Sequence, residues 1–316
     1  MVHLRIVAPQ WLAERVLAVL ERWPSVLNVV RLPDAARRPR GDIILFDVPR
    51  EDASVLVAEL RELGIERDGT ISIQEIESAP SRLAQQAIAA ARGSPADAVV
   101  WEEVEQRTSE SAELSGSFVA FMVIATLIAA VGILTDSVVL IIGAMVVGPE
   151  FGPLAGICIA VVERRLGLAR RSLTALGVGF STAIAVTLGA TLVFRALDLA
   201  PDALGAVSHP TTLFISEPST FSVIVALLAG VAGVLSLTTA KSGALIGVLI
   251  SVTTIPAAAN VGVALAYADW NEFAGALAQL TINLGSIVIA GVATLSIQRA
   301  AYDRRRASRA QGSNAR

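Results

Sequence analysis

Chemistry in this chain is concentrated where two long apolar runs are interrupted by proline and small residues. The first run reads IGAMVVGPEFGPLAGICIAVVE over residues 142–163, and the second reads IGVLISVTTIPAAANVGVALAYAD over residues 246–269. Each begins with Ile-Gly, meets proline after about two helical turns, and ends on an acid. The separation of matching residues grows from 104 at the first glycine to 106 at the final acid. Corresponding interrupted helices in two halves of a membrane protein are typical of a transporter with a midplane site.

Proline removes a backbone donor and clashes with the preceding turn, so it frees carbonyl groups that must be buried in protein or face water. The breaks therefore predict a binding site inside a helical bundle. Half-helix N-termini suit an anion and freed carbonyls suit a cation, and the sequence leaves both open. The candidate transport or substrate-binding residues are Gly148, Pro149, Glu150, Pro153, Pro256, Asn260 and Asn283.

Glu150 is the one acid well inside a predicted span, and an ionisable residue at membrane depth is a functional hypothesis in itself. One interpretation makes it a proton carrier. The other makes it a carboxylate that caps a half-helix or sits in a water-filled vestibule. Nearby hydroxyl side chains are expected to form hydrogen bonds between helices, whereas Asn260 and Asn283 are favoured as ligands; the hydroxyl residues are Ser251, Thr253, Thr254 and Thr281.

The composition indicates a membrane protein with a soluble N-terminal part. The chain has 316 residues, of which 54% are hydrophobic, above the 45–50% usual for soluble proteins. Most charge lies in residues 1–114, and residues 117–297 are nearly all apolar. A span needs about 20 apolar residues. Six candidates follow: 117–134, 138–162 (interrupted at 148–153), 173–194, 220–238, 243–267 (interrupted near Pro256) and 273–297.

The loops between these spans predict the orientation. Positive residues gather in alternate loops and in the tail after the last span: Arg164, Arg165, Arg170, Arg171, Lys241, Arg299, Arg304, Arg305, Arg306, Arg309 and Arg316. The positive-inside rule then places both termini in the cytoplasm, in the cytoplasmic membrane of a prokaryote. Three spans in each half, 117–194 and 220–297, force the halves into opposite orientations, which is a 3+3 inverted repeat.

The N-terminal residues predict a small α+β domain. Strands at 3–7, 25–32, 42–48 and 70–76 and helices at 9–22 and 50–64 give the order β-α-β-β-α-β, a ferredoxin-like unit. Its loop 33–41 carries Arg37, Arg38 and Arg40, which form either a clamp for an anionic regulator or a solvated hairpin tip.

Two amphipathic helices, 81–92 and 95–110, are expected to connect this domain to the membrane part, with Val99, Val100 and Val104 on one side of the second. The predicted organisation is therefore a regulatory domain (1–78), a connector (79–116), a six-helix membrane domain (117–297) and a basic tail (298–316).

Several motifs resemble the DUF389 family of hydrophobic membrane proteins. They are IGAMVVGPEFGP (142–153), GVLISVTTIPAAANVGVALAYADW (247–270), LTINLGSI (280–287) and, in the soluble part, LRELGIERDGTISI (60–73). The resemblance implies the two broken helices, while the family name records an unknown function. Two positions depart from the family pattern: Glu150 replaces an apolar residue, and Pro256 is followed by Ala257 in place of a second proline.

The main hypothesis is a secondary transporter of a small solute or ion, regulated by a nucleotide or amino acid bound to the cytoplasmic domain. The alternatives are an ion channel gated by that domain and a membrane sensor or scaffold that moves nothing. A homo-oligomer, trimer or dimer, is expected. We expect no enzyme activity, cofactor, metal or nucleic-acid partner, because the chain has one cysteine, two histidines and none of the usual catalytic motifs.

Overall fold

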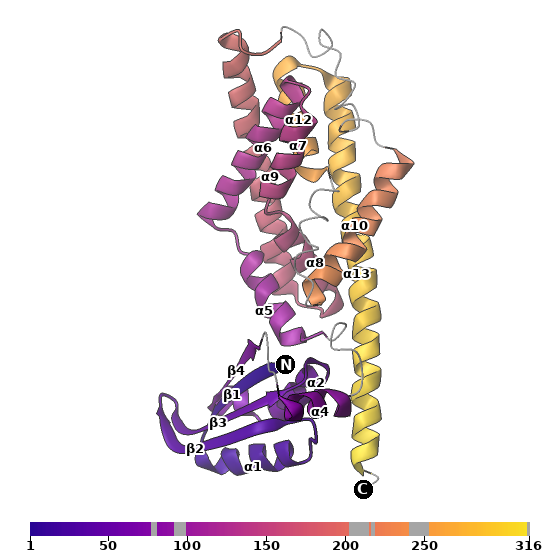
Figure 1. Cartoon of the computed structure of the whole chain (residues 1–316). Coiled ribbons are helices and arrows are strands. Elements are labelled where there is room, and N and C mark those ends of the chain that lie inside the picture. Colours follow the sequence, from indigo (N-terminus) through magenta and orange to yellow (C-terminus); the bar gives the residue numbers. More distant parts are fainter. Residues whose placement is uncertain (77–80, 92–98, 202–214, 216–218, 240–252, 315–316) are drawn as a thin grey trace. The chain divides into compact units, whose positions relative to one another are not determined.

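The computed structural model describes residues 1–76, 81–91, 99–201, 215, 219–239 and 253–314 (Figure 1). The chain divides into two compact units. Unit 1 comprises Met1–Val104 and Thr238–Ala240, and unit 2 comprises Glu105–Leu237 and Lys241–Arg316. The boundary near residue 104 lies within the segment expected to be a connector. The four-part division drawn from the sequence stays a prediction.

Unit 1 contains a four-stranded antiparallel sheet in the order β2-β3-β1-β4. Two helices connect the strands in the predicted order β-α-β-β-α-β, which is confirmed, and one short helix precedes the last strand. The bounds are β1 Val2–Ala8, α1 Gln10–Glu21, β2 Leu27–Arg37, β3 Arg40–Val48, α2 Arg50–Glu62, α3 Ile65–Asp68 and β4 Thr70–Glu75.

The core of unit 1 lies between this sheet and helices α1 and α2. Alternate residues of a strand point to one face, and Leu4 and Ile6 of β1 are fully buried on the face that meets the helices. Leu12 and Val16 of α1 and Leu56 of α2 pack against them in one hydrophobic cluster. The alternate residues of β1 and the helically spaced residues of α1 therefore pack together in a single core.

The β2–β3 hairpin is longer than predicted, because β2 continues to Arg37 through most of the expected loop 33–41. Polar side chains fix its outer half. Buried Asp42 accepts hydrogen bonds from the Asp34 amide at 2.9 Å and from the Arg31 guanidinium at 2.8 Å. The Asp34 amide, and then Arg31, lower the pKa of Asp42. The stabilisation is therefore present at neutral pH and is lost as pH falls below about 3.9, the usual Asp value, towards the lowered pKa.

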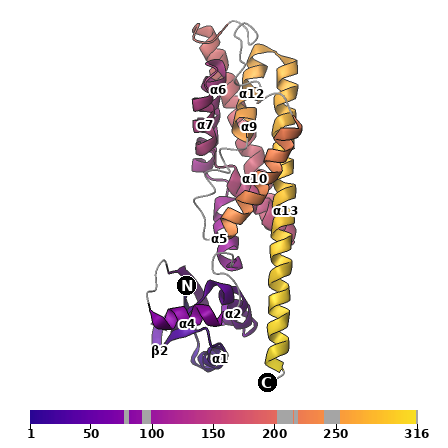
Figure 2. The same cartoon turned by 45° about the vertical axis from the view of Figure 1, so that its right-hand side comes forward.

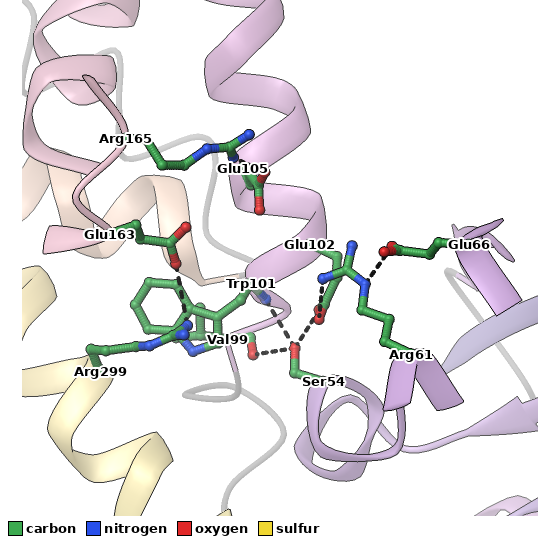
Figure 3. A network of polar contacts seen from close by, with 10 residues as sticks. All are labelled: Ser54, Arg61, Glu66, Val99, Trp101, Glu102, Glu105, Glu163, Arg165 and Arg299. Carbon is green, nitrogen blue, oxygen red and sulfur yellow. Dashed lines mark hydrogen bonds and ion pairs between the residues drawn. The ribbon is translucent and has the colours of Figure 1, made fainter. Parts of the chain in front are cut away.

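Two further helices follow the sheet: α4 (Arg82–Ala90) and α5 (Trp101–Ser111). Helix α5 begins later than predicted, so Val99 and Val100 precede it. Within unit 1, the Trp101 amide donates to Ser54 Oγ at 2.9 Å, and that hydroxyl donates to Glu102 at 2.7 Å (Figure 3). These bonds to α2 fix the first turn of α5.

Unit 2 is built from apolar helices, and the chain is a multi-pass membrane protein. Four helices are long and apolar enough to cross a membrane, and α7 and α8 together form a fifth candidate bent by 51°. The bounds are α6 Gly116–Leu134, α7 Val138–Val147, α8 Phe151–Val162, α9 Leu166–Ala196, α10 Thr220–Thr238, α12 Thr254–Tyr267 and α13 Trp270–Asn314. Most of the first half of the predicted span 243–267 lies outside the described residues.

Two helices extend beyond their predicted spans. The loop 163–172 is short, because α9 already begins at Leu166, and the basic tail is helical to Asn314. In both views α9 and α13 run in opposite directions (Figures 1 and 2). Each of the two short helices packs against both long ones: α8 contacts α9 and α13, and so does α12.

Replacing Asp42 with alanine should destabilise the β2–β3 hairpin by about 1–3 kcal/mol, because the Asp34 amide and Arg31 would lose a buried acceptor. Hydrogen exchange of β3 amides at neutral pH, followed by mass spectrometry, measures the change. The control Asp34→Asn removes an exposed ion pair with Arg40 but keeps a residue type that tolerates the left-handed backbone there (φ 47°), so it should exchange like wild type. Equal acceleration in both variants would contradict the prediction.

Candidate functional site

The first interrupted run forms a true helix break at residues 148–150. Helix α7 ends at Val147 with Gly148 as its C-cap, and α8 begins at Phe151 with Glu150 as its N-cap. Pro149 lies between them and cannot donate a backbone hydrogen bond. The predicted break therefore exists, and its three central residues were all predicted as site residues.

Pro153 and Pro256 both lie in the first turn of a helix, and the interruption predicted near Pro256 stays a prediction. Each is the third residue of its helix, α8 and α12 respectively. Amides of the first helical turn have no intrahelical acceptor, so proline is tolerated there. These prolines therefore mark the starts of α8 and α12. Residues 240–252 lie outside the described residues, so the element that precedes α12 is not described.

Glu150 is buried, with 4% of its surface exposed. Its Oε1 accepts a hydrogen bond from the Thr254 hydroxyl at 2.5 Å, which joins the starts of α8 and α12. Its Oε2 has no hydrogen-bond partner among the described residues. A Cβ added at Gly148 would lie 2.4 Å from this oxygen and 2.5 Å from Ile255 Cγ1, so the carboxylate fills the space beside the glycine.

A second polar cluster adjoins this pair and contains a residue that the sequence analysis missed. Asn283 of α13 donates to Thr253 Oγ1 at 3.0 Å. Gln279, one turn earlier on α13, donates to Asn283 Oδ1 at 3.3 Å and to Thr253 Oγ1 at 3.4 Å. Gln279 is 1% exposed, and its Oε1 has no partner among the described residues. The sequence signal that could have identified Gln279 is its spacing of four residues from Asn283, which puts both on one helix face.

Asn260 is not part of this cluster. Its amide donates to Glu272 Oε1 at 2.8 Å, and its own Oδ1 is buried without a partner among the described residues. Asn260 follows Thr253 by seven residues, about 10 Å along a helix axis. The structure thus brings Glu150 and Asn283 to the start of α12 and places Asn260 farther along that helix. Thr281 is exposed, and its hydroxyl donates to the Leu277 carbonyl of its own helix.

Two arginines that the sequence analysis did not connect to the site hold the far ends of the half-helices. Arg195 of α9 donates to the Ala266 carbonyl at 2.5 Å and lies 4.4 Å from the ring centre of Tyr267. Arg299 of α13 pairs with Glu163, the C-cap of α8, at 3.2 Å (Figure 3). A cation at a helix C-terminus is favourable because it interacts with unpaired carbonyls and the helix dipole.

The predicted regulatory arginines lie at the hairpin of unit 1, where Arg37 ends β2 and Arg40 begins β3. Arg40 pairs with Asp34 at 3.2 Å, and Arg38 is exposed at the turn. The anion clamp stays a prediction. Among the described residues, no group of three or more His, Cys, Asp or Glu side chains could hold a metal ion.

Comparisons with known proteins bear out the family resemblance. Residues 145–289 match the family model described as Domain of unknown function (DUF389), which covers the first interrupted run from residue 145 and all of the second, but not residues 60–73. An uncharacterized protein of Methanocaldococcus jannaschii is 26% identical over 198 residues. That match covers 63% of this chain and 59% of the relative, so the chain spans less than two thirds of its length. No solved structure matches the chain.

Gly148→Ala should destabilise unit 2 by about 1–3 kcal/mol, because the added methyl group would overlap Glu150 and Ile255 in a packed interior. Thermal unfolding of the purified protein in detergent measures this. Gly143→Ala is the matched control on α7, since a Cβ there meets nothing within 4 Å. We expect that control to be neutral or slightly stabilising. If both variants melted like wild type, the close contact at Gly148 would be wrong.

Proposed function

We propose that this multi-pass membrane protein, whose residues 145–289 form a DUF389 domain, is a secondary transporter of a small solute or ion. In this proposal two inverted repeats of three spans, 117–194 and 220–297, bind the substrate where their half-helices begin. The observation that carries the proposal is the hydrogen bond from Thr254 to Glu150. It joins residues 104 positions apart, at the start of α12 and at the start of α8.

The same separation of 104 residues relates the first helix of each half. Helices α6 and α10 each contain 19 residues, and both bounds of α10 follow those of α6 by 104 positions. Their caps also correspond. Ser115 accepts a hydrogen bond from the Phe118 amide, and Ser219 accepts one from the Ser222 amide, both at 3.1 Å. These serines and amides are again 104 positions apart.

The turns that end α8 and α12 are also 104 residues apart. After α8, the Arg165 amide donates to the Ala160 carbonyl at 2.9 Å. After α12, the Asp269 amide donates to the Ala264 carbonyl at 3.0 Å. Both turns lead directly into a long helix, α9 in the first half and α13 in the second. The separation thus stays at 104 and needs no gap.

Two contacts between the halves are equivalent to each other under the 104-residue separation. A Cβ at Gly291 would lie 2.7 Å from Cys158 Sγ, where α13 meets α8. A Cβ at Gly262 would lie 3.0 Å from Thr187 Cβ, where α12 meets α9. Adding 104 to Cys158 and Thr187 gives Gly262 and Gly291. Each half therefore makes the same contact with the other, as two-fold symmetry requires.

The arginines at the half-helix ends fit the same symmetry. Arg195 and Arg299 are 104 positions apart, and so are Glu163 and Tyr267, the residues beside them. Because α9 and α13 run in opposite directions (Figure 1), the repeat is inverted. A residue that contacts its own equivalent must lie near the two-fold axis. The Glu150–Thr254 pair therefore marks the centre of the proposed bundle.

The burial of this centre favours a transporter over the two alternatives. A channel requires a polar path that stays open, whereas Glu150, Thr254, Gln279 and Asn283 are all at most 4% exposed. An inert scaffold would be expected to pair its buried polar atoms, whereas Glu150 Oε2 and Gln279 Oε1 have no partner among the described residues. A closed site with free ligand atoms suits alternating access.

The rest of the proposal follows the sequence analysis. The alternating positive loops place both termini in the cytoplasm of a prokaryote. Unit 1 would then be a cytoplasmic regulatory domain, with Arg37, Arg38 and Arg40 as the site for an anionic regulator such as a nucleotide or for an amino acid. Assembly into a trimer or dimer is part of the same proposal.

The inverted topology can be tested with two exposed residues that are equivalent in the repeats, Arg164 and Ala268. Each is replaced by cysteine in a Cys158→Ala background, which removes the chain's one natural cysteine. A membrane-impermeant maleimide should label Arg164→Cys from the cytoplasmic face of vesicles and Ala268→Cys from the opposite face. Labelling of both from one face would rule out the inverted repeat.

The transport activity can be tested in proteoliposomes, by currents on a solid-supported membrane and by uptake of labelled solutes. The panel contains inorganic ions, amino acids and organic acids. We expect a saturable flux of at least one of them, reduced about tenfold or more in Glu150→Gln, because the variant lacks the buried charge. A flux that does not saturate would support a channel. No flux of any solute would support a scaffold.

A further inference from the structure

We infer that the starts of α8 and α12, with the facing turn of α13, bind a small monovalent inorganic cation. This inference rests on the proposed function, because it names the class of ion that the transport site takes. It begins from two buried oxygens, Glu150 Oε2 and Gln279 Oε1, which have no hydrogen-bond partner among the described residues. The side chain of Glu150 is hydrogen-bonded to Thr254, and that of Gln279 is hydrogen-bonded to the adjacent residue Thr253.

The hydrogen bonds of the cluster leave two of its buried acceptors unpaired among the described residues. The Asn283 amide nitrogen donates to Thr253 Oγ1, and the Gln279 amide nitrogen donates to Asn283 Oδ1 and Thr253 Oγ1. The Thr254 hydroxyl donates to Glu150 Oε1. One carboxylate oxygen, Glu150 Oε2, and one amide oxygen, Gln279 Oε1, therefore stay unpaired among the described residues. A positive ligand would satisfy both of them.

The charge of the site limits the ion. The structure places no ion-pair partner beside Glu150 within the residues it describes, so its counter-charge is free to come from a ligand. One carboxylate balances one positive charge, whereas Ca²⁺ and Mg²⁺ sites usually use more carboxylates or bound phosphates. Carboxylate, amide and hydroxyl oxygens favour hard cations over transition metals. Na⁺ and K⁺ therefore fit the donor set best.

A proton is a weaker candidate than an alkali ion. Protonation of Glu150 would give that carboxyl group its own donor, but it would leave Gln279 Oε1 without a partner. A cation that both oxygens bind would satisfy both. The glutamine is therefore the residue that distinguishes the two ligands, and its substitution is part of the test.

The proposed site takes most of its ligands from the second half, although the two halves are related by a constant separation of 104 residues. The first-half equivalents of Thr253, Gln279 and Asn283, 104 positions earlier, are Pro149, Ala175 and Gly179. These residues offer no side-chain oxygen. The ligands therefore come from the second half together with Glu150, which gives one cation site and not a symmetric pair.

The test is thermal unfolding of the purified full-length protein in detergent, followed by tryptophan fluorescence. Samples contain NaCl, KCl or choline chloride at constant ionic strength. An ion that binds only the folded state raises the melting temperature with its concentration and saturates its site. We expect this for Na⁺ or K⁺ relative to choline. Equal melting temperatures in all three salts would overturn the inference.

Variants locate the bound ion. Glu150→Gln and Gln279→Met should each raise the half-saturating concentration, the first by about tenfold or more because a charged ligand is lost. The matched controls lie on the same helix as Gln279. Glu272→Gln changes an acid that bonds Asn260, and Thr281→Val changes an exposed hydroxyl. Both should keep the wild-type concentration. Unchanged saturation in Glu150→Gln and Gln279→Met would place the ion elsewhere and overturn the inference.

Two outcomes separate this inference from the proposed function. Saturable stabilisation by Na⁺ or K⁺ without flux of any solute in proteoliposomes would support the cation site and contradict transport. A saturable flux that neither ion affects, in a protein that neither ion stabilises, would support transport and contradict the cation site. Loss of folding in Gln279→Met leaves Glu150→Gln, which keeps the shape of the side chain, as the deciding variant.

Discussion

Backbone groups released at a helix break cannot stay unpaired in hydrocarbon, and a carboxylate at such a break is costlier still. In unit 2 the start of α12 covers the break at residues 148–150, where Thr254 donates to Glu150. Several other features follow from this arrangement. Gly148 has no room for a side chain, and the two short helices pack against both long ones.

Much of the fold can be predicted from the sequence where one physical signal dominates. Helix α10 has the predicted bounds, and α6 differs by one residue, because long apolar runs between polar ends leave few alternatives. The order of elements in unit 1 follows from alternation and helical spacing. Proline is ambiguous by contrast, since it occurs both at a break and in a first helical turn. Pro149 is the first case, and Pro153 and Pro256 are the second.

Features that depend on contacts between distant segments could not be predicted. Matching the glycines and acids of the two runs adds two residues to the separation, whereas the contacts of Cys158 with Gly291 and of Gly262 with Thr187 need none. Gln279 shares a helix face with Asn283, but its hydrogen bond to Thr253, 26 residues earlier, appears only in the folded chain. Arg195 and Arg299 differ from other positive residues only through the helix ends they contact. In each case the partner, and not the residue type, determines the role.

The constant separation of 104 residues has a consequence for how such a sequence can change over generations. One residue inserted into a helix of either half would rotate every later side chain of that helix by about 100°. An insertion in α8 before Cys158 would separate it from Gly291, and one in α9 before Thr187 would separate that residue from Gly262. Replacement of single side chains meets no such barrier, as threonine opposite glutamate at the centre illustrates. A gene built from two copies of one segment would therefore accumulate substitutions freely while the length of each copy stays fixed.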